Sequence, residues 1–268
     1  MTNITKTNTT NKIDHSNTDS QLSRRAFLST TGALVVSLAA PSEWNEASAD
    51  TLATRPPLKG DEISSYITIE PDGSVVAYYG KIDGGQGLGT AIAQMVAEEI
   101  DVAYERVKVV MGDSGQTLDM GGASAAIGVS HGGMMLRRTA AETRRLLVEM
   151  ASHKLNLPAD ALTVSDGIVH AKADPSKRVS YAELIGGRYL DNKVKWNGKL
   201  SNGLRLEVAA PLKTHTEYKV IGQSLPRRDL PGKVFGTLEM VNDVRLPNML
   251  HARMIRPPVA GAVPVAVD

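Results

Sequence analysis

The sequence has no cysteine, few aromatic residues and almost no net charge, and each shortage excludes a class of function. Without cysteine, the chain itself cannot carry disulfides, iron–sulfur clusters or thiolate metal sites. Aromatic residues make up 4% of the chain, too few for a platform that stacks single-stranded nucleic acid. A formal net charge of +1 argues against a polyanion binder, so we expect no nucleic-acid partner. The six histidines show no metal-ligand spacing, and we predict no metal site within the chain.

An apolar run long enough to span a bilayer comfortably is also missing, and residues 1–49 instead have the pattern of an export signal. Arg24 and Arg25 precede a moderately apolar run over residues 26–40, and the small residues 47–49 form a cleavage site. The spacing around the two arginines resembles a twin-arginine signal, although an ordinary secretory signal can also contain two arginines. We therefore expect a periplasmic protein that is exported in the folded state.

Local patterns in the remaining chain predict an α+β fold. Turn residues between alternating apolar runs indicate two hairpins, one at 71–73 and one at 166–167. Apolar spacing indicates a helix through about Asp101 and a second one after residue 133. Other expected elements are a buried strand at 106–111, a short helix capped by Ser180, and short strands broken by prolines from Tyr218 onward. In the second helix we place Leu136, Ala140, Leu147 and Ala151 on one face and Arg137, Arg138, Arg144 and Arg145 on the solvated side.

A glycine-rich loop, Gly84 to Gly89, lies between a predicted strand and a predicted helix and contains a single amide side chain, Gln86. Backbone N–H groups at a helix start favour an anion, and glycines allow close approach, so this layout suits a phosphate. A tight turn without a ligand is one alternative. A dinucleotide site is another, with Asp113 as its ribose-binding acid, but the third glycine comes one place too early for that motif. The hairpin before the loop also favours an antiparallel sheet.

A longer stretch supports a third interpretation. The segment that begins GKIDGGQGLGTAIAQMVAEEID and ends GVSHGG resembles the pterin-binding segment of the molybdenum hydroxylases, the xanthine dehydrogenase and aldehyde oxidase family. The resemblance continues through AAETRRLLVEMASHKLNLPADALTVSDGIV and returns from Tyr218, in a segment similar to the start of the family's hammerhead domain. The order of these segments resembles the exported bacterial branches, the nicotinate dehydrogenase-like and isoquinoline 1-oxidoreductase-like subunits.

The resemblance implies a division of the chain and a set of cofactor contacts. The divisions are a signal peptide (1–49), a linker (50–63), a molybdopterin-binding segment (64–190), a connecting segment (191–217) and a truncated hammerhead-like start (218–268). The implied contacts to the pterin or its phosphate are Gly85, Gln86, Gly87, Gly122, Ala123, Ser124 and Ala125. In the second of these loops the family often has Ser or Thr where this chain has alanines, so backbone donors would have to replace hydroxyls.

The resemblance also implies a reaction and partners. The family hydroxylates N-heterocycles or oxidises aldehydes with oxygen from water, using molybdopterin, here expected in its cytosine dinucleotide form. Electrons would pass to a small [2Fe–2S] subunit and then to a cytochrome c or another respiratory-chain acceptor. The family's catalytic glutamate would follow residue 268, so the catalytic residues are unknown, and we expect the chain alone to be poorly stable and inactive.

Other polar residues suggest no further chemistry. We interpret Glu98, Glu99 and Asp113 as ordinary surface or capping carboxylates and His131 as structural or at the surface. The rival hypothesis from another class is a non-catalytic exported binding module that keeps the glycine loop.

Overall fold

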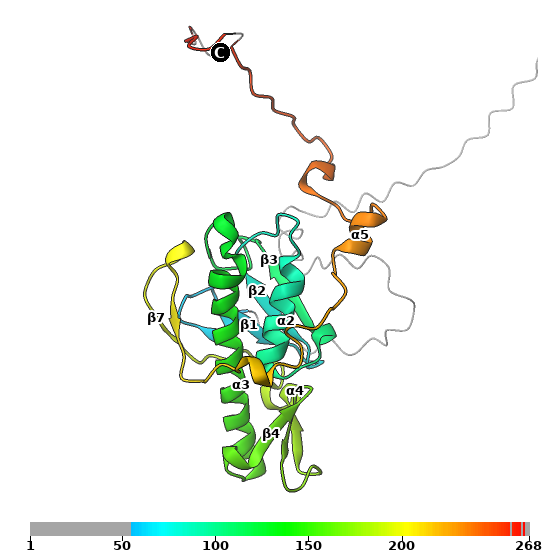
Figure 1. Cartoon of the computed structure of the whole chain (residues 1–268). Coiled ribbons are helices and arrows are strands. Elements are labelled where there is room, and N and C mark those ends of the chain that lie inside the picture. Colours follow the sequence, from blue (N-terminus) through cyan, green and yellow to red (C-terminus); the bar gives the residue numbers. More distant parts are fainter. Residues whose placement is uncertain (1–54, 258, 264, 266–268) are drawn as a thin grey trace, which may run out of the picture. The chain divides into compact units, whose positions relative to one another are not determined.

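The computed structural model describes residues 55–257, 259–263 and 265. The predicted signal peptide and the first residues of the predicted linker, 50–54, lie outside this range. Within the described part, no helix combines the length and the apolar character needed to cross a membrane. Two small sheets and two long helices form most of the regular structure, as the mixed α+β prediction requires (Figure 1).

The first hairpin forms as the turn residues predict. Strand β1 (Ile67–Ile69) pairs antiparallel with β2 (Val75–Tyr79), and the turn between them bends at Gly73, whose φ of 76° suits a residue without a side chain. The Asp72 carboxylate accepts a hydrogen bond from the Ser74 N–H at 2.8 Å. All residues of both strands are buried, so this hairpin supplies much of the core.

The next connection differs from our expectation. After β2 the chain passes through the glycine loop into helix α2 (Leu88–Ile100) and returns as β3 (Val107–Met111), which pairs parallel with β2. The prediction of a purely antiparallel sheet is therefore wrong, because α2 carries the chain back to the opposite end of the sheet. Strand β3 lies at the sheet edge, where Val107 alone is fully covered, so the expected buried strand is only partly buried.

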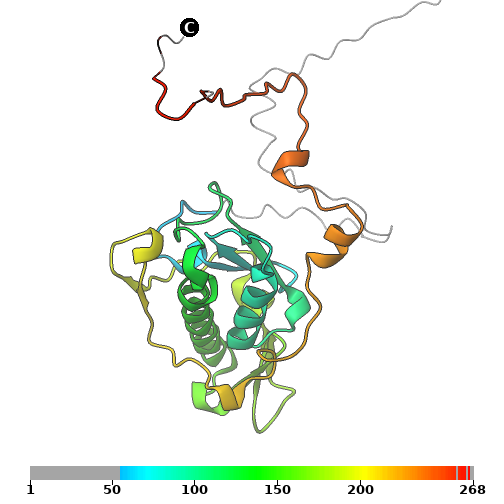
Figure 2. The same cartoon turned by 45° about the horizontal axis from the view of Figure 1, so that its top comes forward.

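Helix α3 (Met134–Leu155) packs beside α2 and against the sheet (Figure 2). A π-helical turn, η5 (Gly128–Gly133), precedes it. The predicted apolar face is confirmed, because Leu136, Ala140, Leu147 and Ala151 are all fully buried.

A second sheet packs against the later turns of α3 (Figure 1). It consists of β4 (Leu162–Ser165), β5 (Ile168–Ala171) and β6 (Arg178–Ser180), all antiparallel, and is followed by helix α4 (Tyr181–Ile185). The predicted turn at 166–167 is confirmed, with both residues at positive φ. The predicted cap of α4 is confirmed as well: Ser180 and Glu183 form a reciprocal capping box.

The part of the chain after α4 has little regular structure. It contains a two-residue ladder between β7 (Lys195–Trp196) and β8 (Leu206–Glu207), and helix α5 (Leu230–Val234). The described residues from 218 onward contain no strand, so the expected short strands are not formed. Alternating apolar residues need a partner strand to form a ladder, and none of the described elements provides one. The domain boundaries inferred from the sequence stay predictions.

Candidate functional site

The first predicted contact residues lie at the start of α2. Gly87 is the residue before the helix, with φ 84°, and Gly85 has φ 108°; both values favour glycine over any residue with a side chain. Gln86 is exposed between them. The sequence therefore placed this loop correctly at a helix N-terminus.

The amides of this loop already have an acceptor from the chain itself. Asp83 Oδ1 accepts hydrogen bonds from the Gly85 N–H at 2.8 Å and the Gly87 N–H at 3.2 Å, and Oδ2 accepts from the Gly89 N–H at 3.4 Å. Burial alone would raise the pKa of Asp83, but these three donors together hold it below its usual value. The N–H groups of Gly85, Gly87 and Gly89 are therefore not free for a ligand in this structure, because the aspartate occupies the position at the helix start that an anion would take.

The second predicted contact loop is held by a buried lysine that sequence reasoning missed. Lys81 lies two residues after the end of β2 and is 2% exposed. Its Nζ donates to the carbonyl oxygens of Gly121 at 3.2 Å and Gly122 at 2.8 Å, and to Asn202 Oδ1 at 2.7 Å. Burial lowers the pKa of Lys81. The only signal in the sequence was a lysine placed between a buried strand and a glycine loop.

A cavity of about 420 Å³ opens between this second loop and the carboxyl ends of the parallel strands β2 and β3. Such strand ends are where open α/β sheets place their ligands. The cavity is lined by Gly80, Lys81, Ile82, Gly112, Ser114, Thr117, Asp119, Gly121, Gly122 and Ala123. At Gly122 no atom lies within 4 Å of the position that a Cβ would take, so its backbone is accessible to a ligand.

The structure does not bring both predicted loops into this cavity. Gly122 and Ala123 line it, whereas Gly85, Gln86 and Gly87 do not. Ser124 and Ala125 belong to the one-turn 3-10 helix Ser124–Ala126 that leaves the loop. Asp83 and Gly89 lie on either side of these three loop residues in the sequence. They border a separate cavity of about 290 Å³ together with Lys108 and Arg228.

A flat, phosphorylated pterin fits the second loop better than the first. The second loop offers open backbone at Gly122 beside a cavity, and the Ser124 residue is exposed next to it. At the first loop, a phosphate would have to displace the Asp83 carboxylate from the amides that it occupies. The roles of the individual contact residues stay predictions.

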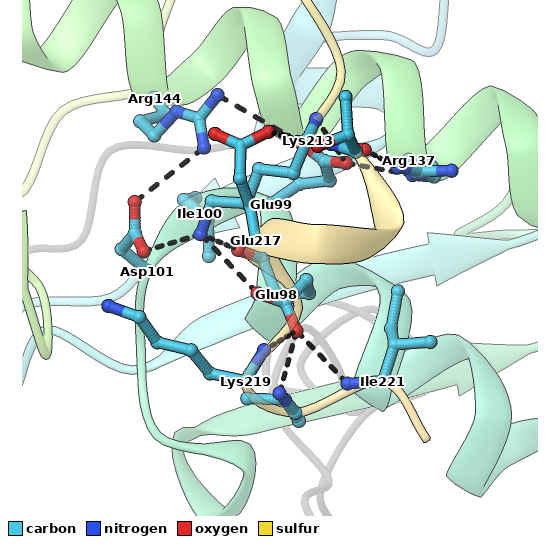
Figure 3. A network of polar contacts seen from close by, with 12 residues as sticks. Glu98, Glu99, Ile100, Asp101, Arg137, Arg144, Lys213, Glu217, Lys219 and Ile221 are labelled. Carbon is cyan, nitrogen blue, oxygen red and sulfur yellow. Dashed lines mark hydrogen bonds and ion pairs between the residues drawn. The ribbon is translucent and has the colours of Figure 1, made fainter. Parts of the chain in front are cut away.

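Two carboxylates on α2 have a structural role that we did not foresee. Glu98 and Glu99 are 1% and 0% exposed, so their interpretation as surface or capping groups is wrong. Glu99 Oε1 accepts from Arg137 Nε at 2.7 Å, and Glu98 accepts from backbone amides of a distant segment (Figure 3). Asp113, in contrast, caps its own turn as expected, accepting from the Gly115 N–H at 2.8 Å.

The arginines of α3 are likewise not its solvated side. Arg137 and Arg144 have side chains that are 13% and 17% exposed, and both face Glu99. Arg138 donates to the Leu206 carbonyl oxygen at 2.9 Å. Only Arg145, paired with Glu142 and Glu149 on the same helix, is exposed enough to fit the expectation.

Neither a metal cluster nor a catalytic group is evident in the part of the chain that the structure describes. No group of three or more His, Cys, Asp or Glu side chains there could hold a metal ion. His131 lies within hydrogen-bond distance of the Ser130 hydroxyl at 3.2 Å, and the described contacts of its ring include no carboxylate. The geometry supports a binding site, with a cavity and an open backbone at Gly122.

Relatives that match most of this chain include the following three proteins. One of the subunits of nicotinate dehydrogenase from Pseudomonas putida is 38% identical over 77% of this chain and 16% of that protein. The beta chain of isoquinoline 1-oxidoreductase from Brevundimonas diminuta is 29% identical over 92% of this chain and 35% of that protein. A membrane-bound aldehyde dehydrogenase of Gluconacetobacter polyoxogenes, named for pyrroloquinoline quinone, is 28% identical over 88% of this chain and 30% of that protein.

These three relatives are much longer than the present sequence, which spans between 16% and 35% of their length. The model of one family, described as a molybdopterin cofactor-binding domain, matches residues 39–235. This match covers most of the chain and includes both glycine loops, α2, α3 and the cavity at the ends of β2 and β3. The chain therefore belongs to the molybdopterin cofactor-binding domain family.

Proposed function

We propose that this chain is the cofactor-binding part of a molybdenum hydroxylase that hydroxylates N-heterocycles or oxidises aldehydes with oxygen from water. The observation that carries the proposal is the cavity at the carboxyl ends of β2 and β3, with the open backbone of Gly122, in a chain of the molybdopterin-binding family. Two relatives are named for N-heterocycles and one for aldehydes, which supports these two substrate classes.

The second loop would hold the cofactor mainly through its backbone. Gly122 and Ala123 present peptide groups to the cavity, and Lys81, which also lines the cavity, fixes the loop through the carbonyl oxygens of Gly121 and Gly122. Such peptide arrays bind anions without charged side chains. The bound molybdopterin, which we propose in its cytosine dinucleotide form, supplies the metal for the redox chemistry.

The partners and the compartment form a second part of the proposal. Because the chain has no cysteine, the [2Fe–2S] clusters of such an enzyme belong on a small partner subunit, which would pass electrons to a cytochrome c or another respiratory-chain acceptor. The paired arginines at 24–25 support twin-arginine export to the periplasm. Since the chain spans at most 35% of these relatives, we propose that it is inactive without further polypeptide.

Expression of the full chain in a host that makes the cofactor tests the proposal. Purified protein should contain molybdenum and pterin in amounts equal to the chain, measured by metal analysis and by pterin fluorescence after oxidation. A chain free of both would contradict the proposal and leave the non-catalytic binding module as the better hypothesis.

Two further assays on the same sample separate the remaining alternatives. One relative is named for pyrroloquinoline quinone, so the sample is also assayed for that quinone. The parallel β2–α2–β3 unit resembles a dinucleotide-binding layout, so NAD is titrated as well, with no binding expected because Asp83 occupies the loop amides.

A further inference from the structure

A segment far along the chain lies against α2 and ends at the first glycine loop. Residues 213–229, which we call the strap, run along α2 antiparallel to the helix. Lys213 Nζ donates to Asp101 Oδ1 at the C-terminal end of α2, at 2.5 Å. Gln94 Nε2 donates to the Val220 carbonyl oxygen at 3.1 Å in the middle of the helix. Near the start of α2, the Arg228 N–H donates to Thr90 Oγ1 at 3.3 Å.

Glu98 holds the centre of the strap. Its Oε2 accepts hydrogen bonds from three successive N–H groups, those of Lys219 at 2.8 Å, Val220 at 2.6 Å and Ile221 at 3.0 Å (Figure 3). Lys213 Nζ lies 3.5 Å from the other oxygen. Burial raises the pKa of Glu98, but the three backbone donors outweigh it and hold the pKa below its usual value. A carboxylate this deeply buried is stable only because its charge is satisfied in this way.

The neighbouring Glu99 holds the start of the strap to α3 as well as to α2. It accepts from the Lys213 N–H at 3.1 Å and from Arg137 Nε at 2.7 Å, and Arg137 also donates to the Lys213 carbonyl oxygen. The two adjacent carboxylates share Lys213 but differ in their other partners. Glu99 also binds Arg137 of α3, whereas Glu98 binds only the strap among the described residues, through the amides at 219–221 and Lys213. Loss of Glu98 should release the strap without breaking the contact between α2 and α3.

The far end of the strap contacts the glycine loop. Arg227 Nη2 donates to the Gly85 carbonyl oxygen at 3.0 Å, and the same guanidinium is fixed by Asp229 Oδ2 at 2.6 Å. A Cβ at Gly87 would lie 2.9 Å from Arg227 Nε, so the arginine leaves no room for a side chain there. Glu98 itself lies eleven residues along α2 from Gly87, about 16 Å at the helical rise. Any effect of Glu98 on the loop must therefore pass through the strap or through the helix.

We propose that Glu98 is a positioning residue for the glycine loop 83–89: it fixes the strap on α2, and Arg227 at the end of the strap holds the loop in the conformation in which Asp83 accepts from its amides. Retention of the cofactor by the second loop would depend on this conformation. The part that concerns the cofactor rests on the proposed function. The part that concerns the loop rests only on the contacts above.

Hydrogen exchange of the full 268-residue chain, followed by mass spectrometry, tests both contacts: that of Glu98 with the strap and that of Arg227 with the glycine loop. Glu98→Gln removes the charge that the three strap amides share, so exchange at 219–221 and at 84–89 should both rise by about tenfold or more. Arg227→Ala breaks only the last contact, so exchange should rise at 84–89 and stay unchanged at 219–221. Glu149→Gln, the same change on α3 at a side chain that is 55% exposed, should alter neither segment.

The pattern of exchange decides the proposal. If Glu98→Gln frees residues 219–221 while the loop keeps its protection, or if Arg227→Ala leaves the loop unchanged, the strap does not hold the loop and the proposal is wrong. If Glu98→Gln does not fold, the comparison of Arg227→Ala with the parent still decides whether the strap end holds the loop.

Cofactor content of the same proteins, prepared in a cofactor-producing host, tests whether the position of the loop affects cofactor retention. Molybdenum and pterin per chain should fall in Glu98→Gln and Arg227→Ala but not in Glu149→Gln. Equal content in all four proteins would overturn the part of the proposal that concerns the cofactor. If the parent chain itself carries no cofactor, the proposed function fails, whereas the exchange pattern still decides whether the strap positions the loop.

Discussion

At the scale of single residues, the buried carboxylates of α2 show what local sequence patterns miss. Glu98 and Glu99 follow each other in the chain, so they point in different directions from the helix, and both are nevertheless buried. The reason is that α2 is covered by α3 on one side and by the strap on another, and each covering element supplies donors. Neither partner is close in sequence, so the apolar spacing of the helix could not reveal them.

The contacts of Glu99 predict that its replacement lowers the stability of the fold. Glu99→Gln leaves the largely buried Arg137 without its carboxylate, whereas Arg144 keeps Asp101 at 3.6 Å, and the change should lower the free energy of unfolding by roughly 3 kcal/mol. Urea unfolding monitored by circular dichroism measures the change. Glu149→Gln is the control, because its pair with Arg145 is a surface i,i+4 pair worth about 0.5 kcal/mol or less. Equal midpoints for the two variants would show that the buried network carries no net stability.

The lowered pKa of Asp83 predicts how the free energy of unfolding changes with pH. Because its pKa in the folded state lies below the usual 3.8, its ionised form stabilises the fold above that pH, and this contribution is lost as pH falls through the folded-state pKa. Asn at this position can still cap the helix but does not titrate. The difference in unfolding free energy between the parent and Asp83→Asn should therefore be constant above about pH 5 and shrink below about pH 4.

Urea titrations at several pH values measure that difference. Glu98 and Glu142 also have lowered pKa values, but they are present in both proteins, so their contributions cancel in the comparison. A difference that grows toward low pH would mean that Asp83 is not held in its ionised form by the loop amides.

At the scale of elements, turns and caps were predictable and long-range pairings were not. Asp166-Gly167 and the Ser180 cap depend on residues within four positions, and the structure forms both. The parallel pairing of β2 with β3 depends on how α2 packs, which no local pattern encodes. The same holds for Lys81, whose acceptors at Gly121, Gly122 and Asn202 lie at least 40 residues away.

We expect the same substitution, glycine to alanine, to have opposite effects on stability and ligand binding at two glycines of the segment that leads into α3. Gly122→Ala places a methyl group where no atom lies within 4 Å, so stability should stay unchanged while the added group blocks the approach of a ligand to the backbone. Gly132→Ala places it 2.7 Å from the Tyr79 ring, whose hydroxyl donates to the Gly128 carbonyl oxygen. The second change should destabilise the fold by about 1–3 kcal/mol.

Unfolding midpoints and cofactor content, measured on both variants, separate the two effects. Loss of molybdenum and pterin in Gly122→Ala at an unchanged midpoint would support the second loop as the cofactor contact. Full cofactor content in Gly122→Ala would place the contact elsewhere in the molecule.

At the scale of the whole molecule, the core and most of the large exposed apolar side chains lie in different parts of the sequence. The core cluster draws on residues between Ile63 and Leu206, with strap residues up to Leu225 packed against it. From residue 230 onward no described residue is buried, and large apolar side chains such as Phe235, Leu250 and Ile255 are 79%, 94% and 93% exposed. A series of apolar side chains of this kind favours association with other protein surfaces.

Removal of residues 230–268 should therefore separate folding from association. The shortened chain keeps the strap, with Arg227 and Asp229, and loses no residue of the core, so its urea midpoint should equal that of the parent. Its tendency to associate should fall, seen as a molar mass by light scattering that no longer rises with concentration. A lower midpoint would instead show that this segment stabilises the fold. Unchanged association would place the associating surface on the part of the chain before residue 230. The cavity at the ends of β2 and β3 is then the first region to examine by mutation.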